Sequence, residues 1–320
     1  MTDFTYAVAY IRALEPTLFS ATTIEQLLAC STYDQCLQFL QEKGWGRQDQ
    51  PLTAEAILAA ETEKTWEAIG ALNNIDMSVF DVLSFPKLYH NLKAAVKQHC
   101  TEDRVPNVFY KDTAITGQAM LDILQRKAFG ELPGNMEEAA KEAYETLLQT
   151  GDGQLCDMII DRACLEAIHE AGVTSEDEFI RDYAISTVQV SNIKIAARCM
   201  VTGKPEEFTI KALAPCDGLN VADMAKAAAS GSLLPLLQEC GFAEAADAIA
   251  ESPSAFERWC DNRIIDTIQP QLYDAFSVGP LVAYVLAREN EIKTVRIILS
   301  GKLNKLPDES IRERVRKMYV

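Results

Sequence analysis

Apolar residues recur every three or four positions along most of the chain, which is the spacing that buries one stripe of an α-helix. Near the C-terminal end this stripe consists of Val285, Ile292, Val295 and Leu299, which lie seven, three and four positions apart. Ala, Leu, Glu, Gln and Lys dominate many windows, and these residue types favour helices. We find no convincing run of β-branched residues in alternation. The sequence therefore predicts an all-α protein.

Six long helices are expected, as three consecutive pairs. The first pair covers about residues 54–72 and 81–100, and the third covers about 253–276 and 280–299. The second covers about 136–171, with an interruption around 151–153, and about 176–201. Short helices precede the first and third pairs. The helices of each pair are expected to pack as a bundle.

The second helix of each pair carries an asparagine that is followed six positions later by a basic residue. The three copies are Asn91 with Lys97, Asn192 with Arg198, and Asn290 with Arg296. The asparagines are separated by 101 and 98 residues. A period near one hundred indicates three copies of one supersecondary unit. We therefore expect three pseudo-symmetric helical repeats, over residues 1–106, 107–207 and 208–320.

The repeated asparagine and its basic partner do not form one binding face. Six residues on a helix correspond to a rotation of about 600°, so the two side chains point in different directions. An asparagine inside an apolar helix is costly unless its amide is hydrogen bonded. We interpret each asparagine as an interhelical pin in its bundle, with a ligand site as the alternative.

Charge narrows the classes of partner. The chain has 47 acidic and 30 basic residues, a net charge of −17, which argues against nucleic acid and against direct adhesion to anionic lipid. No window of eighteen apolar residues and no signal-like start are found, so a cytoplasmic protein without lipid insertion is expected. Nine cysteines without a CxxC pair fit a reducing compartment, as buried small hydrophobes. A membrane-associated role would therefore act through another protein.

Two Gly-Lys pairs, Gly203-Lys204 and Gly301-Lys302, invite comparison with a phosphate-binding loop. A Walker A loop needs a glycine four residues before the pair and Ser or Thr after it, and neither copy has them. Both pairs are better explained as C-terminal helix caps with a cation at the negative end of the helix.

The candidate reactive groups are few. Asp157 and Asp161 have the spacing of a solvated helix surface, and we interpret them so. Cys100 with His90 or His99 leaves a thiol or metal enzyme as a competing possibility, although no carboxylate motif frames these residues. We predict no catalytic, cofactor-binding or metal-binding site.

Both ends of the chain resemble one known family. Residues 6–15 (YAVAYIRALE), 280–303 (PLVAYVLARENEIKTVRIILSGKL) and 306–314 (LPDESIRER) are similar to the terminal signatures of the family of V-type (A-type) ATPase C subunits. This family is the bacterial and archaeal relative of the d subunit of the eukaryotic vacuolar ATPase. The likeness extends over essentially the whole chain and is weaker from about residue 105 to 150.

The resemblance implies a non-catalytic central-stalk, or rotor, subunit of a V/A-type ATPase or ATP synthase. Such a protein folds as three helical bundles in a funnel and sits on the cytoplasmic face of the membrane proteolipid ring. It couples the shaft, made of the D and F subunits, to that ring, for ATP-driven ion transport or ion-driven ATP synthesis. The alternative is a cytosolic α-helical scaffold with another partner, although the repeats of such scaffolds are usually 33 to 47 residues long.

Overall fold

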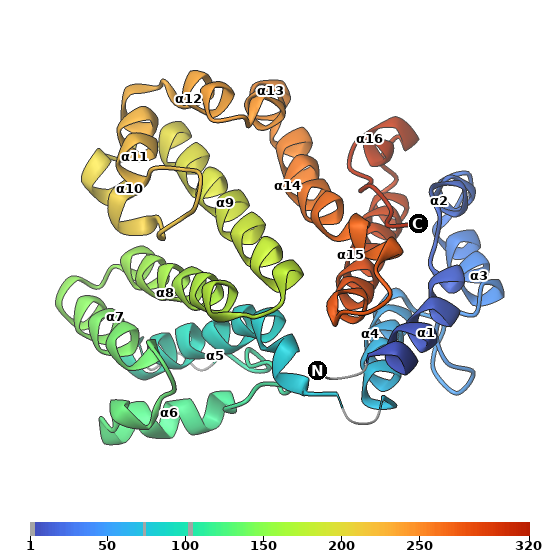
Figure 1. Cartoon of the computed structure of the whole chain (residues 1–320), viewed down its shortest axis with the longest axis horizontal. Helices are drawn as coiled ribbons and strands as arrows, with labels where there is room; N and C mark the ends of the chain where they lie inside the picture. Colours follow the sequence, from blue (N-terminus) through green and yellow to red (C-terminus); the bar gives the residue numbers. More distant parts are fainter. Residues whose placement is uncertain (1–3, 73–74, 102–104) are drawn as a thin grey trace. The chain divides into compact units, whose positions relative to one another are not determined.

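The computed structural model describes residues 4–72, 75–101 and 105–320, and all regular structure in these residues is helical (Figure 1). The prediction of an all-α protein is confirmed. Backbone contacts divide the chain into two compact units. Unit 1 comprises Met1–Asp76 and Asp247–Val320, and unit 2 comprises Met77–Ala246, so the boundary falls within α13 (Ala243–Glu251). The division into three helical repeats stays a prediction.

Unit 1 combines the N-terminal helices with the last ones. Its helices are α1 (Thr5–Leu14), α2 (Ala21–Leu28), α3 (Tyr33–Glu42), α4 (Ala54–Gly70), α14 (Pro253–Ile268), α15 (Gly279–Leu303) and α16 (Asp308–Arg312). Turns of 3₁₀-helix lie at Glu15–Thr17 and Gln269–Tyr273. Hydroxyl side chains fix four of the helix starts, because each accepts a hydrogen bond from the backbone N–H three residues later. These caps are Ser20, Thr32, Thr53 and Ser252.

Helix α15 is the centre of unit 1. Every residue from Gly279 to Arg288 is buried, as expected of a helix that is apolar on all sides. The predicted stripe of Val285, Ile292, Val295 and Leu299 is confirmed as buried. The C-terminal half of α15 packs against α2, α3 and α4, segments more than two hundred residues away in the sequence (Figure 1). The N-terminal and C-terminal parts of the chain therefore share one core.

Unit 2 is continuous in sequence. Its helices are α5 (Asp81–Thr101), α6 (Gly117–Arg126), α7 (Met136–Thr150), α8 (Gly153–Thr174), α9 (Glu178–Val201), α10 (Glu206–Ala212), α11 (Val221–Ser230) and α12 (Leu233–Glu239). Turns of 3₁₀-helix lie at Met77–Phe80 and Phe129–Glu131. Helix α8 contacts α5, α7 and α9, and α9 contacts α10 and α11. The long helices α5, α8 and α9 therefore form the frame on which the shorter ones pack.

Most of the predicted helix ends lie close to the observed ones, and one is clearly wrong. The interruption expected near residues 151–153 is confirmed, because Gly151 takes a left-handed conformation with φ 67° and Asp152 caps α8. The helix predicted to run to residue 276 is wrong, since α14 ends at Ile268 and a 3₁₀ turn follows. Pro270 explains the end of α14, because proline supplies no N–H and clashes with the preceding turn of a helix.

Only one of the two Gly-Lys pairs ends a helix. Gly203 follows α9 with φ +62°, and the backbone N–H of Lys204 donates to the carbonyl of Cys199 at 2.9 Å, so the first prediction is correct. The prediction for Gly301-Lys302 is wrong, because α15 continues to Leu303. An added Cβ at Gly301 would lie 2.5 Å from the side chain of Ile311, so this glycine permits the chain after α15 to pack back on the helix.

Helices α8 and α9 are in tight contact at Gly172. A Cβ atom at this position would lie 2.4 Å from the Cβ of Ala184, closer than two non-bonded carbon atoms can come. Because the neighbouring atom is fixed to the backbone, it can move only if one helix moves. Gly172 therefore sets the distance between these two helices.

We expect Gly172→Ala to lower the free energy of unfolding by about 1–3 kcal/mol, because the added methyl overpacks a rigid contact. The matched control is Gly70→Ala, at the last residue of α4, where an added Cβ meets no atom within 4 Å. This control should leave stability unchanged or raise it by up to about 1 kcal/mol. Urea denaturation followed by circular dichroism measures both, and equal stability of the two variants would contradict the expectation.

Candidate functional site

Asn91 and Asn192 bind the main chain of a segment that follows them. The side-chain amide of Asn91 donates to the carbonyl of Tyr110 at 2.9 Å, and its oxygen accepts from the N–H of Tyr110 at 2.8 Å. Asn192 makes the same pair of bonds with Ala214, at 2.8 and 3.1 Å. Both asparagines are fully buried. Each asparagine therefore binds both the N–H and the carbonyl of a single residue. This residue lies 19 positions downstream of Asn91 and 22 positions downstream of Asn192.

Asn290 makes a weaker version of this contact. Its amide donates to the carbonyl of Lys317, 27 residues downstream, at 2.9 Å, and the side chain is only half-buried. The N–H of Lys317 is bound instead by the side chain of Asn262 in α14. The interpretation of the asparagines as interhelical pins is wrong in one respect. Tyr110, Ala214 and Lys317 all lie outside helices, so each asparagine holds a non-helical segment against its helix.

The basic residues of the motif lie in different surroundings. Lys97 forms an ion pair of 2.7 Å with Asp157 of α8. Arg198 and Arg296 are exposed, and each lines a cavity. The asparagine and the basic residue of each copy thus do not share a contact, in agreement with the rotation between them.

The other candidate reactive groups have structural partners. Lys93 and Lys97 of α5 pair with Asp161 and Asp157. The side chain of Asp161 is 54% exposed, in agreement with a solvated helix surface, and that of Asp157 is 36% exposed. The Nε2 atom of His90 lies 3.1 Å from the carbonyl of Val108.

Cys100 and His99 show no arrangement of a nucleophile with its base. His99 stacks on Tyr144, with ring centroids 5.6 Å apart. Burial raises the pKa of the Cys100 thiol, which disfavours the reactive thiolate. Among residues 4–72, 75–101 and 105–320, no three His, Cys, Asp or Glu side chains are placed to hold one metal ion.

A buried charged cluster lies in the core of unit 1. Arg288 of α15 binds Glu61 of α4 and, at 2.7 Å, Glu291 one turn further along α15. All three side chains are at most 6% exposed. The guanidinium carbon of Arg288 also lies 5.4 Å from the centroid of the Trp45 ring, which adds a cation–π contact. We refer to Glu61, Arg288 and Glu291 as the Arg288 cluster.

Backbone groups complete the Arg288 cluster. Glu291 accepts from the N–H of Phe19 at 2.8 Å, and Glu61 accepts from the N–H of Gly46 at 2.9 Å. Lys64 donates to Glu61 at 2.7 Å, so two positive and two negative side chains are balanced. The cluster therefore ties α15 and α4 to two loops of the N-terminal region.

The sequence-based reasoning missed this cluster, although a signal for it exists. Arg288 and Glu291 lie one helical turn apart in a helix whose other positions are largely apolar, and such a pair is rarely buried unless a further partner neutralises it. The further partner, Glu61, lies 227 positions away. Only the fold identifies it.

Protonation of Glu291 is shifted by its surroundings. Burial raises its pKa to about 7, against the opposing effects of Arg288 and of the Phe19 N–H. For Arg288, burial lowers the pKa, but Glu291 and Glu61 outweigh it, so the pKa is raised. The arginine thus stays charged, and Glu291 takes up a proton at a higher pH than an ordinary glutamate does.

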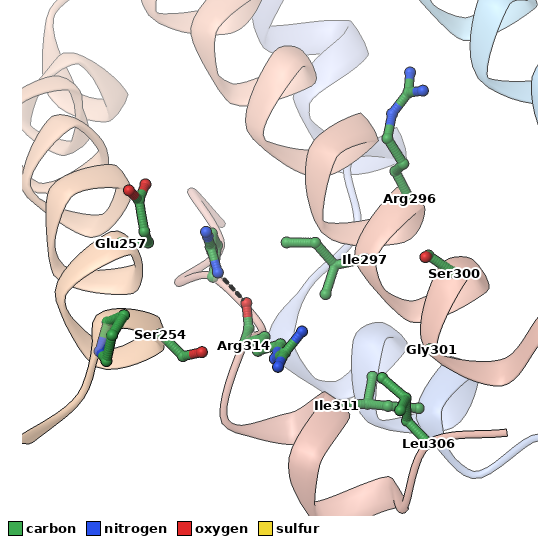
Figure 2. A pocket seen from close by; sticks show the side chains of 11 residues that line it. Ser254, Glu257, Arg296, Ile297, Ser300, Gly301, Leu306, Ile311 and Arg314 are labelled. Atoms are coloured by element: carbon green, nitrogen blue, oxygen red, sulfur yellow. Dashed lines mark hydrogen bonds between the residues drawn. The ribbon is translucent and has the colours of Figure 1, made fainter. Parts of the chain in front are cut away.

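Each unit contains a cavity. Cavity 1, of about 440 Å³, lies between α14, α15 and the C-terminal segment of unit 1 (Figure 2). Cavity 2, of about 740 Å³, lies between α5, α8, α9 and α10 in unit 2. Both have arginine or lysine side chains beside apolar ones.

We expect Asn192→Leu to lower the free energy of unfolding by about 2–4 kcal/mol, because it leaves the buried N–H and carbonyl of Ala214 without partners. Asn290→Leu is the matched comparison, since it removes one bond at a half-buried site and should cost less than about 1.5 kcal/mol. Urea denaturation of both variants measures the difference. A larger loss at Asn290 than at Asn192 would contradict this explanation.

A second prediction concerns pH. Because the pKa of Glu291 is higher in the folded state than its ordinary value of 4.5, the folded protein holds this proton more tightly. The wild-type protein should therefore lose stability relative to Glu291→Gln as pH rises from about 4.5 to about 7, by up to about 1.4 kcal/mol per pH unit. Unfolding free energies of both proteins from pH 5 to 8 measure this. A difference that is constant across the range would contradict it.

No helix in the described part of the chain combines the length and the apolar content that a membrane span requires.

Comparison with known proteins identifies the family. The sequence model of the family described as "ATP synthase (C/AC39) subunit" matches residues 7–314. The chain is 22% identical over 327 aligned positions to the C subunit of the V-type sodium ATPase of Enterococcus hirae, with 97% of each chain covered. It is 25% identical over 170 positions to the C subunit of the A-type ATP synthase of Methanocaldococcus jannaschii, covering 49% of this chain and 42% of that protein. The chain belongs to the ATP synthase (C/AC39) subunit family, which makes it a non-catalytic subunit of a V/A-type ATPase.

Proposed function

We propose that this protein is a central-stalk subunit that couples the shaft, made of the D and F subunits, to the membrane proteolipid ring. In this role it transmits rotation for ATP-driven ion transport or ion-driven ATP synthesis. It is held at the cytoplasmic face of the membrane through the ring, without entering the lipid. The observation that carries the proposal is the match to the C subunit of a V-type sodium ATPase over 97% of both chains.

The construction of unit 1 supports a part that transmits torque. The Arg288 cluster and the buried length of α15 join the first and last segments of the chain in one core. Close-packed helical cores resist deformation because their side chains have little free volume. Ends that are fixed to one another are suited to carrying load between two partners.

The charge of the chain also supports attachment through protein contacts. With a net charge of −17, the surface is repelled by anionic lipid head groups, so binding to the membrane requires another protein. Stable contacts between subunits bury more than about 2,000 Å² in total. We therefore expect extended contacts with the ring and with the shaft.

The test is direct binding. The purified chain is mixed separately with the D–F complex and with the detergent-solubilised ring of the same organism, and each mixture is passed through a size-exclusion column. We expect co-elution with both. An unrelated acidic helical protein of similar size serves as the control, and it should elute alone. Separate elution of the chain from both partners would refute the coupling role.

A further inference from the structure

Two of the nine cysteines meet at the turn between α2 and α3 in unit 1. Cys30 follows the end of α2, and Cys36 lies near the start of α3. Both bind the same backbone oxygen, because the carbonyl of Leu27 accepts from the N–H of Cys30 at 3.2 Å and from the thiol of Cys36 at 3.7 Å. This shared acceptor holds the two cysteines side by side.

The two thiols are in hydrogen-bonding contact with each other. The thiol of Cys30 also donates to the carbonyl of Gln26 at 3.6 Å, one residue before the oxygen that both cysteines share. Cys36 is fully buried in the core of unit 1, whereas Cys30 is half-buried against the same core. A disulfide joins sulfur atoms about 2 Å apart, so two thiols that already touch need only a small further approach to form one.

Burial and charge give the two thiols different roles. Burial, followed by the neighbouring Cys30, raises the pKa of the Cys36 thiol to about 12, and the ammonium of Lys302 opposes this rise. Because the thiolate is the nucleophile, a buried thiol with a raised pKa is not the first to react with an oxidant. Cys30 is therefore the residue that a small oxidant reaches, and Cys36 is the residue that can complete a disulfide.

The turn lies beside the C-terminal end of α15. The ammonium of Lys302 donates to the carbonyl of Leu28, the last residue of α2, at 2.8 Å, and to Asp308 at 2.7 Å. We refer to residues 21–42 as the α2–α3 hairpin, which packs on the C-terminal half of α15 (Figure 1). Its helices have 8 and 10 residues, and helices of this length depend on tertiary packing for their stability. A covalent link across the turn would make the hairpin open less readily.

We propose that Cys30 and Cys36 form a reversible disulfide in the presence of hydrogen peroxide, and that this disulfide locks the α2–α3 hairpin on α15. The Cys30 thiolate first attacks one peroxide oxygen. The O–O bond breaks, Cys30 becomes a sulfenic acid, and the hydroxide that leaves takes up the proton that Cys30 had lost. The sulfur of Cys36 then attacks that of Cys30, so the S–S bond forms, the S–O bond breaks, and the oxygen leaves as water with the proton of Cys36. Two thiols thus lose two electrons, and one peroxide is reduced to two molecules of water.

Reduction restores the two thiols. In a reducing compartment disulfides are transient, so the pair rests as thiols. A dithiol breaks the S–S bond by exchange, returns a proton to each cysteine, and is itself oxidised to a disulfide. The inference concerns unit 1 alone, and it is independent of whether the chain binds the shaft and the ring.

Mass spectrometry tests for the bond. The whole chain is treated with hydrogen peroxide, its free thiols are blocked with iodoacetamide, and it is digested with a protease that cuts before aspartate, between Tyr33 and Asp34. The two cysteines then lie on different peptides, which a disulfide joins and dithiothreitol separates. We expect the joined peptides in the wild type and in Cys240→Ser, which removes an exposed thiol elsewhere, and not in Cys30→Ser. In Cys36→Ala, oxidation should stop at a sulfenic acid on Cys30 that dimedone traps. Circular dichroism verifies that each variant folds.

Hydrogen exchange measures the lock. The amides of α3 should exchange on the order of tenfold more slowly in the oxidised wild type than in the reduced one, because the disulfide restricts the opened hairpin. Cys30→Ser, treated with peroxide in the same way, should show no such change. Absence of joined peptides at a peroxide concentration that oxidises the exposed Cys240 would overturn the proposal. A Cys30 that stops at sulfenic or sulfinic acid in the wild type would do the same, as would a disulfide that leaves the exchange of α3 unchanged.

Discussion

A guanidinium group that is buried in a protein core needs acidic partners beside it, and Arg288 is such a group in unit 1. Its partners come from α4 and from its own helix, and their remaining oxygens are satisfied by backbone groups of two N-terminal loops. Removing any one partner would leave a buried charge, which is far more costly than replacing the whole set. The position of α15 relative to the N-terminal helices of unit 1 is therefore specified by charge as well as by apolar packing.

A second constraint acts after the long helices. Asn91, Asn192 and Asn290 each hold a later, non-helical segment by its main chain. Because every residue except proline supplies both a peptide carbonyl and an N–H, such a contact tolerates almost any residue in the held segment. This explains how the same asparagine can recur in three sequence contexts that otherwise differ. It also keeps irregular segments in place without further helices.

These features fit the proposed coupling role. The Arg288 cluster of unit 1 holds the core, and Arg198 and Arg296 are exposed and line cavities. Membership of the ATP synthase (C/AC39) subunit family agrees with such a division between a stiff interior and binding surfaces. A non-catalytic subunit of such an ATPase needs a stiff core and surfaces that bind its neighbours, and it needs no reactive side chains.

The sequence by itself determined the helical class, the buried stripe of α15, the interruption at Gly151 and the repeated asparagine, because each depends on residues within a few turns of one another. It misplaced the end of α14 and the cap at Gly301, and it gave no partners for Asp157 and Asp161. Those features depend on tertiary contacts between segments that are distant in the sequence. The same is true of the Arg288 cluster and of both cavities. Glu61 and Arg288 are 227 positions apart, and local patterns contain no information on their separation in space. Only tertiary packing brings these two residues together. In the folded core, burial of either charge is costly unless the other charge neutralises it.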